Sequence, residues 1–103
     1  MFSILSNRET NLNHLPKTLV ELKYSDGSLA QNGINKLYKL KRINVYNNKF
    51  IYNLDHLANN LIELDISYNN KINQIGIMKL RNVKKLNITG NKKIYNLDHL
   101  AYS

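Results

Sequence analysis

The feature of this sequence that most constrains its fold is an internal repeat. The seven residues Tyr52–Ala58 recur unchanged as Tyr95–Ala101, 43 residues further along the chain. The segment Leu19–Leu22 recurs as Leu61–Leu64 with one substitution. A unit of 42 to 43 residues therefore occurs twice, at about residues 19–60 and 61–103. Self-similarity at a fixed period predicts structural units that stack, because a single unit cannot bury its own apolar face.

Each unit divides again into two shorter repeats. The pattern L-x-x-L-x-L-x-x-N occurs four times, starting at residues 19, 40, 61 and 83. Its copies are Leu19, Leu22 and Tyr24; Leu40, Ile43, Val45 and Asn48; Leu61, Leu64, Ile66 and Asn69; and Val83, Leu86, Ile88 and Asn91. The first copy has Gly27 where the asparagine is expected. The alternation of apolar and polar residues predicts one strand with a buried face in every copy.

The pattern resembles the leucine-rich repeat family, and its period of 21 to 22 residues resembles the short-repeat class of internalins and phosphatase regulators. The second half of such a repeat, I-x-x-L-x-x-L, is expected at Ile51, Leu54 and Leu57, at Ile94, Leu97 and Leu100 and, as a variant, at Ile72, Ile75 and Met78. The resemblance implies an α/β solenoid. This is a short curved array with a parallel sheet on its concave face and 3₁₀ turns or loops on its back face.

The whole chain, residues 1–103, is predicted to form a single leucine-rich-repeat domain. A partial repeat over residues 1–18 precedes the four repeats, because Leu12–Leu15 aligns with Leu54–Leu57. Neither end shows the polar cap that such arrays normally need for solubility. We therefore keep open the alternative that the chain is a fragment of a longer array, or a truncated remnant without an independent function.

The asparagine that closes each strand has a structural explanation. A side-chain amide both donates and accepts hydrogen bonds, so it can bond to the turning backbone of its own repeat and of the next one. Asn48, Asn69 and Asn91 are predicted to form such a ladder. Gly27 has no side chain to do so, and the first full repeat is expected to be looser.

The residues between the buried strand positions form outward columns on the concave face, which is the usual binding surface of a solenoid. One column is Glu21, Arg42, Glu63 and Lys85, and the next is Lys23, Asn44, Asp65 and Asn87. The first column alternates in sign, which predicts a lateral ladder of ion pairs between neighbouring strands. Aromatic residues and arginine are enriched at interface hot spots. The partner-binding patch predicted from these columns and the two tyrosines beside them consists of Arg42, Asn44, Tyr46, Glu63, Asp65 and Tyr68.

The net charge of +8 raises a second function, the binding of nucleic acid or of another anionic surface. The lysines follow the rims of the predicted sheet, for example Lys49, Lys71 and Lys92, where they could contact phosphates. The concave columns lack the basic and aromatic alternation of a nucleic-acid channel. A chain this rich in Asn, Lys, Ile and Tyr also fits an AT-rich genome, so composition alone could supply much of the charge.

Several chemical classes are not expected. The chain has no cysteine, no catalytic motif and no phosphate-binding loop, so neither enzymatic activity nor a cofactor is predicted. His14, His56 and His99 occupy equivalent places two repeats apart, about 10 Å at the strand spacing, too far to share a metal ion. No stretch is long and apolar enough for a membrane span, and the N-terminus does not resemble a signal peptide. We therefore expect a monomer in the cytoplasm, or in a host cytoplasm, whose protein partner the sequence does not identify.

Overall fold

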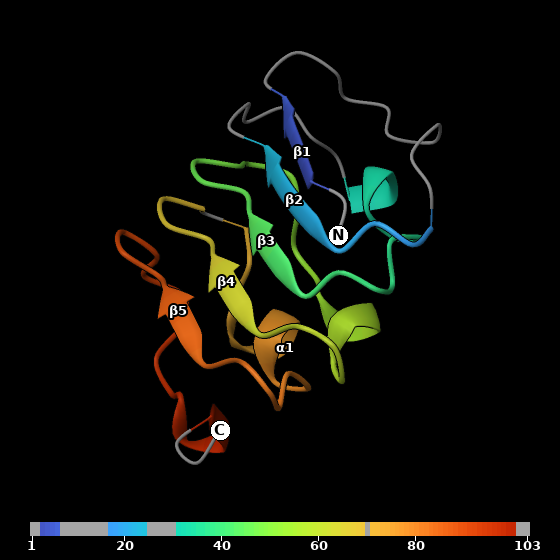
Figure 1. The fold of residues 1–103 in the computed structure, drawn as a ribbon. Helices are drawn as coiled ribbons and strands as arrows, with labels where there is room; N and C mark the ends of the chain where they lie inside the picture. The colour runs from blue at the N-terminus through green and yellow to red at the C-terminus, as the bar shows by residue number, and fades with distance from the viewer. Residues whose placement is uncertain (1–2, 7–16, 25–30, 70, 101–103) are drawn as a thin grey trace.

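The computed structural model describes residues 3–6, 17–24, 31–69 and 71–100. These ranges contain one five-stranded sheet in which the strands lie in chain order and all neighbours are parallel. The strands are β1 (Ser3–Ser6), β2 (Glu21–Tyr24), β3 (Arg42–Asn44), β4 (Glu63–Asp65) and β5 (Lys85–Asn87). Figure 1 shows them side by side, with β1 and β5 at the two edges. The prediction of a parallel sheet is confirmed.

Short helices lie in the connections between the strands. They are η1 (Gln31–Gly33), η2 (Asp55–Leu57) and η3 (Asp98–Leu100), which are 3₁₀ helices, and α1 (Gln74–Ile77), a single α-helical turn. In Figure 1 they form a second row away from the strands. Among the described residues, no helix has the length and apolar character that crossing a membrane requires.

The register of the sheet aligns equivalent positions of the repeats. Arg42 lies opposite Glu21 on one side and Glu63 on the other, and Ile43 lies between Leu22 and Leu64 in the same way. Because successive residues of a strand point to opposite faces, the apolar row faces inward and the charged row faces outward. Both outward columns predicted from the sequence are confirmed by this register.

The core is built from the inward residues of the strands and the apolar residues of the connections. The fully or nearly fully buried residues in the strands or directly after them are Leu22, Tyr24, Ile43, Val45, Leu64 and Ile66. Their counterparts Leu86 and Ile88 are only partly buried, because β5 is the outer strand of the sheet. Most of the predicted partial repeat at residues 1–18, including His14, and the substituted turn at Gly27 lie outside the described residues.

The predicted apolar positions in the connection of the third repeat are wrong in two places. Ile75 is 69% exposed and Met78 is 56% exposed, whereas Ile77 and Leu80 are buried. The cause is local. Buried Ile77 follows buried Ile72 by five positions, whereas in the second repeat buried Leu54 follows buried Ile51 by three. The extra length forms α1, whose N-cap Asn73 accepts a hydrogen bond from the Gly76 amide at 3.1 Å.

Two kinds of repeat therefore alternate along the chain. In the first (19–39) and third (61–82) repeats, a glycine precedes the buried isoleucine of the connection, namely Gly33 before Ile34 and Gly76 before Ile77. In the second (40–60) and fourth (83–103), an asparagine precedes a leucine, and a histidine follows two residues after that leucine. We call them glycine repeats and histidine repeats. This alternation accounts for the period of 42 to 43 residues.

The strand-closing asparagines are buried and bond in two directions. The Asn69 side-chain oxygen accepts hydrogen bonds from the Lys71 and Ile72 amides at 2.7 and 2.8 Å, and its amide nitrogen donates to the Ile51 carbonyl at 3.3 Å. Asn91 likewise accepts from Lys93 and donates to the Ile72 carbonyl. The donated bond thus reaches the preceding repeat, whereas the sequence led us to expect the next one. Asn69 and Asn91 each close their own turn and tie it to the corresponding turn of the preceding repeat, and Asn48 accepts from the Phe50 and Ile51 amides in its own turn.

Candidate functional site

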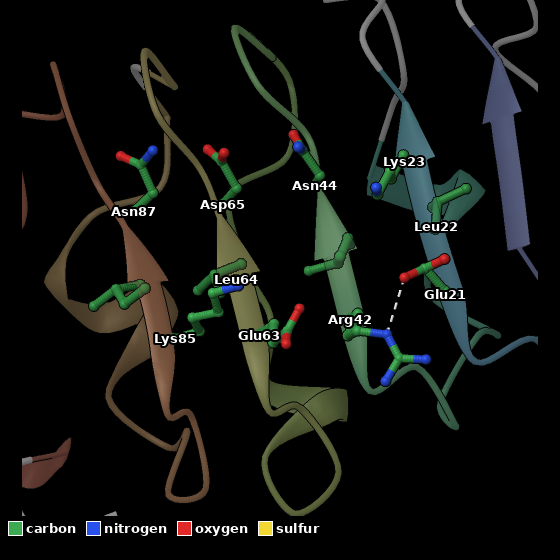
Figure 2. Close-up of a pocket in the computed structure, with 12 residues that line it drawn as sticks. Glu21, Leu22, Lys23, Arg42, Asn44, Glu63, Leu64, Asp65, Lys85 and Asn87 are labelled. Atoms are coloured by element: carbon green, nitrogen blue, oxygen red, sulfur yellow. Dashed lines mark hydrogen bonds and ion pairs between the residues drawn. The ribbon is translucent and has the colours of Figure 1, made fainter.

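The outward face of the sheet carries a groove of about 370 Å³ that crosses four strands (Figure 2). We call this the open-face groove, and its residues are Glu21, Leu22, Lys23, Arg42, Ile43, Asn44, Glu63, Leu64, Asp65, Lys85, Leu86 and Asn87. Each strand contributes three successive residues, of which the middle one belongs to the core and the outer two flank the groove. Short strands in register bring these polar side chains into parallel rows.

Four of the six residues predicted to bind a partner line this groove: Arg42, Asn44, Glu63 and Asp65. The other two, Tyr46 and Tyr68, lie just past the ends of β3 and β4. The prediction omitted Glu21, Lys23, Lys85 and Asn87, which also line the groove. They belong to the same outward columns, so the column pattern alone was sufficient to find them.

The charged column does not form a continuous ion-pair ladder. Arg42 Nε lies 2.9 Å from Glu21 Oε2, and Figure 2 shows the guanidinium turned toward Glu21. Glu63 lies opposite both Arg42 and Lys85 in the register, but over the described part of the chain it forms no ion pair with either. Alternating signs bring opposite charges to neighbouring strands, but one arginine can turn toward only one neighbour. The carboxylate of Glu63 and the amino group of Lys85 therefore remain available on this face.

The second column orients the turns that follow the strands. The side-chain oxygens of Asn44 and Asn87 accept hydrogen bonds from the amides two residues on, Tyr46 and Thr89, at 3.1 and 3.0 Å. Asp65 Oδ1 accepts from both the amide and the hydroxyl of Ser67, at 2.9 and 2.6 Å. Local bonds of this kind are typical of Asx turns. They fix these side chains at the ends of the strands, where Figure 2 shows them in a row with Lys23.

The two predicted tyrosines form an aromatic pair beside the groove. The ring centroids of Tyr46 and Tyr68 are 5.7 Å apart at an interplanar angle of 80°, an edge-to-face arrangement. The side chains are 46% and 48% exposed, so about half of each remains accessible to a partner. The Tyr68 ring also covers Gly90, where an added Cβ would lie 2.5 Å from the ring atom Cδ1. The Tyr68 ring therefore packs against both Tyr46 and Gly90.

The turn position of Tyr68 is unusual for an aromatic residue. Asn47, Tyr68 and Gly90 occupy the same place in successive repeats, with φ angles of 58°, 57° and 76°. Asparagine and glycine are common in this left-handed conformation, but a bulky residue is an outlier there. The amide of Tyr68 donates to the Thr89 carbonyl at 2.7 Å, as the Asn47 amide does to Ser67 at 2.8 Å. Stacked repeats therefore impose on Tyr68 a backbone conformation that it would not choose alone.

The two described histidines bond the neighbouring repeat. The Nε2 of His56 donates to the Ile34 carbonyl at 2.9 Å, and that of His99 donates to the Ile77 carbonyl at 3.0 Å. A carbonyl oxygen can only accept, so Nε2 carries the proton in both rings. Burial lowers the pKa of His56 below its ordinary value of 6.5, while the bond to Ile34 and the neighbouring Asp55 carboxylate oppose this shift.

Besides Lys23, Arg42 and Lys85, which line the groove, exposed lysines lie just before and just after the strands. The lysines after the strand-closing asparagines, Lys49, Lys71, Lys92 and Lys93, are all exposed. Lys41 and Lys84, directly before β3 and β5, are exposed as well. Within residues 17–24, 31–69 and 71–100, no three His, Cys, Asp or Glu side chains gather in a way that could hold a metal ion.

No family model matches the chain. No curated protein and no solved structure matches it either.

Proposed function

We propose that this chain is a short leucine-rich-repeat solenoid without enzymatic activity, and that it binds an extended segment of a partner protein across the open-face groove. The repeat pattern of the sequence and the parallel strands in chain order support the solenoid. The groove supports the binding function, because it crosses four strands and is flanked by polar and charged side chains.

The observation that carries the proposal is the tyrosine pair at the edge of the groove. Tyr46 and Tyr68 are half-exposed and pack edge to face just past the ends of β3 and β4. The unpaired charges of Glu63 and Lys85 lie at the starts of β4 and β5, toward the other end of the groove. A rigid aromatic pair offers a large contact area and loses little side-chain freedom on binding. Unpaired charges toward the other end of the groove can select the partner by complementary charge.

The test begins with the selection of peptides from a displayed random library on the immobilised chain, followed by affinity measurements with the selected peptides. Tyr46→Ala and Tyr68→Ala are each expected to weaken binding by roughly tenfold or more, as hot-spot residues do. Tyr52→Ala and Tyr95→Ala are matched controls, because these tyrosines are exposed but lie in the connections rather than at the ends of β3 and β4. The proposal would be rejected if the control variants lost as much affinity as Tyr46→Ala and Tyr68→Ala. It would also be rejected if no selected peptide bound more weakly to Tyr46→Ala or Tyr68→Ala.

A second candidate function is phosphate binding along the edges, which the exposed row Lys49, Lys71, Lys92 and Lys93 favours. Binding through several phosphate contacts falls steeply with salt, because bound counterions are released. Titration of labelled single-stranded RNA at increasing salt, with Lys71→Gln and Lys92→Gln as variants, tests this function. A steep salt slope that these variants reduce, with Tyr46→Ala unchanged, would favour nucleic acid over a protein partner.

A further inference from the structure

Two different junctions alternate between the stacked repeats. Where a histidine repeat follows a glycine repeat, a glutamine holds the next backbone. The oxygen of Gln31 accepts from the Tyr52 and Asn53 amides at 2.9 and 3.1 Å, and its nitrogen donates to the Asn53 carbonyl at 2.8 Å. Gln74 makes the same three bonds to the backbone of Tyr95 and Asn96. The histidine bonds described above return to the glycine repeat and complete this junction.

The other junction, where a glycine repeat follows a histidine repeat, depends on Gly76. The Leu54 amide donates to the Gly76 carbonyl at 3.1 Å. The two backbones approach so closely here that a Cβ on residue 76 would lie 2.4 Å from the Tyr52 carbonyl oxygen. Only glycine fits this contact, because the obstacle is backbone and cannot rotate away. A salt bridge of 3.7 Å between Lys79 and Asp55 lies at the same junction.

The third repeat packs against one side of the second repeat. The fourth repeat presents an equivalent side, which faces away from the third repeat. Its segment Tyr95–Leu100 is identical to Tyr52–Leu57. The amides of Leu54, Ile66 and Tyr68 all donate to the third or fourth repeat. Their counterparts at Leu97, Ile88 and Gly90 have no acceptor among the described residues. Leu97 and Leu100 are likewise only partly buried, whereas Leu54 and Leu57 are fully buried.

We infer that the β5 edge and the outward side of η3 form a docking surface for one kind of partner, a polypeptide segment with the pattern of the glycine repeat at residues 61–82. Such a segment adds a parallel strand beside β5, accepts hydrogen bonds from the Ile88 and Gly90 amides, and sets a glycine against the Tyr95 carbonyl. The junction between the second and third repeats is its template within this chain. The docking surface thus has the same residue pattern as the side of the second repeat that already binds the third repeat.

The same surface discriminates against a segment of the histidine kind. The residue before the buried leucine in that kind is asparagine, as at Asn53, so its side chain would stand where the contact with the Tyr95 carbonyl requires glycine. Selectivity therefore comes from one backbone contact rather than from apolar area, which both kinds of segment offer. The inference does not rest on the proposed function, because the tyrosine pair and the open-face groove take no part in it.

The experiment supplies the partner as a tethered probe. Residues 61–82 are attached after Ser103 through a flexible Gly/Ser linker of about ten residues, which spans roughly 17 Å and gives a millimolar effective concentration. One matched control carries Gly76→Val in the probe alone, and a second replaces the probe with residues 40–60. Amide hydrogen exchange is followed by nuclear magnetic resonance at Ile88, Gly90 and Leu97 in all three proteins.

Exchange at these amides is expected to slow by about tenfold or more with the 61–82 probe, because hydrogen bonds to a docked segment protect them from opening. Neither control should protect them. Equal protection by the Gly76→Val probe or by the 40–60 probe would overturn the selectivity. Failure of the 61–82 probe to protect any of the three amides would overturn the docking surface itself. Either result leaves the peptide-binding test of the open-face groove unaffected.

Discussion

At the scale of single residues, the position of the Tyr68 ring in the aromatic pair depends on Gly90. Gly90 has a φ of 76°, and the Tyr68 ring occupies the space that a Cβ would need. A residue with a Cβ would meet that ring at 2.5 Å and would also be strained by the positive φ. Gly90 thus leaves room for the Tyr68 ring. The repeat pattern of the sequence does not indicate this contact.

Replacing Gly90 separates these two effects. Gly90→Ala is expected to destabilise the fold by about 1–2 kcal/mol from the backbone strain alone, with a further loss from displacing the Tyr68 ring. In the double variant with Tyr68→Ala, only the strain should remain, so the two substitutions should not be additive. Urea unfolding of the single and double variants measures both quantities. Additive losses would mean that the ring and Gly90 are not coupled.

His56 links stability to pH in a defined direction. Burial lowers the pKa of the folded ring below the unfolded value of 6.5, so the unfolded chain binds the proton more readily. Stability from this group is therefore complete above pH 6.5 and is lost as the pH falls through the lowered pKa. His56→Gln keeps a donor for the Ile34 carbonyl but cannot titrate. The difference in unfolding free energy between wild type and variant should fall with decreasing pH in this window, and a rise would contradict the assignment.

At the scale of elements, the short helix α1 decides which apolar residues of the third repeat reach the core. The sequence spacing favoured Ile75 and Met78, but the Asn73 cap starts a helical turn that directs Ile77 inward instead. The first repeat buries Ile34, at the position equivalent to Ile77, directly after its 3₁₀ helix η1, so the turn itself, and not its α-helical type, sets this face. Local hydrogen bonding therefore overrode the spacing of the apolar residues.

The rotation of α1 predicts a clear contrast between two isoleucines that are two positions apart. Ile77→Ala should cost about 2–5 kcal/mol, because it leaves a cavity in the core. Ile75→Ala should change stability by less than about 0.5 kcal/mol, as most exposed substitutions do. Thermal or urea unfolding of the two variants decides the matter. A larger loss of stability for Ile75→Ala than for Ile77→Ala would mean that Ile75 faces the core, as the sequence spacing favoured.

At the scale of the whole molecule, the stack is held by contacts between adjacent repeats. Stability in such arrays is approximately a sum of repeat and junction contributions. The junction at Gly76 joins the two halves of the 42-to-43-residue duplication, and a single close backbone contact lies at its centre. A substitution at Gly76 should therefore weaken the coupling between the two halves of the chain, although it adds only a small side chain.

Gly76→Ala in the chain itself tests this view. The added Cβ cannot coexist with the Tyr52 carbonyl, so the second and third repeats must separate locally, at a cost of about 1–3 kcal/mol. Unfolding is expected to lose cooperativity and to show two transitions, one for each half. Calorimetry of Gly76→Ala beside Ile75→Ala, a control in the same helix, measures this. A single sharp transition at an unchanged temperature would show that the contact is not limiting.

The sequence by itself determined the strands, their order, their parallel pairing and the two outward columns, because a short period with a two-residue alternation allows few other ways to bury its apolar face. It also placed Arg42, Asn44, Glu63 and Asp65 on one face. Only the tertiary structure decided how those groups are paired, which residues α1 buries, and how Gln31, Gln74 and the histidines join one repeat to the next. These features depend on side-chain direction and on the distance between backbones, which residue spacing does not encode.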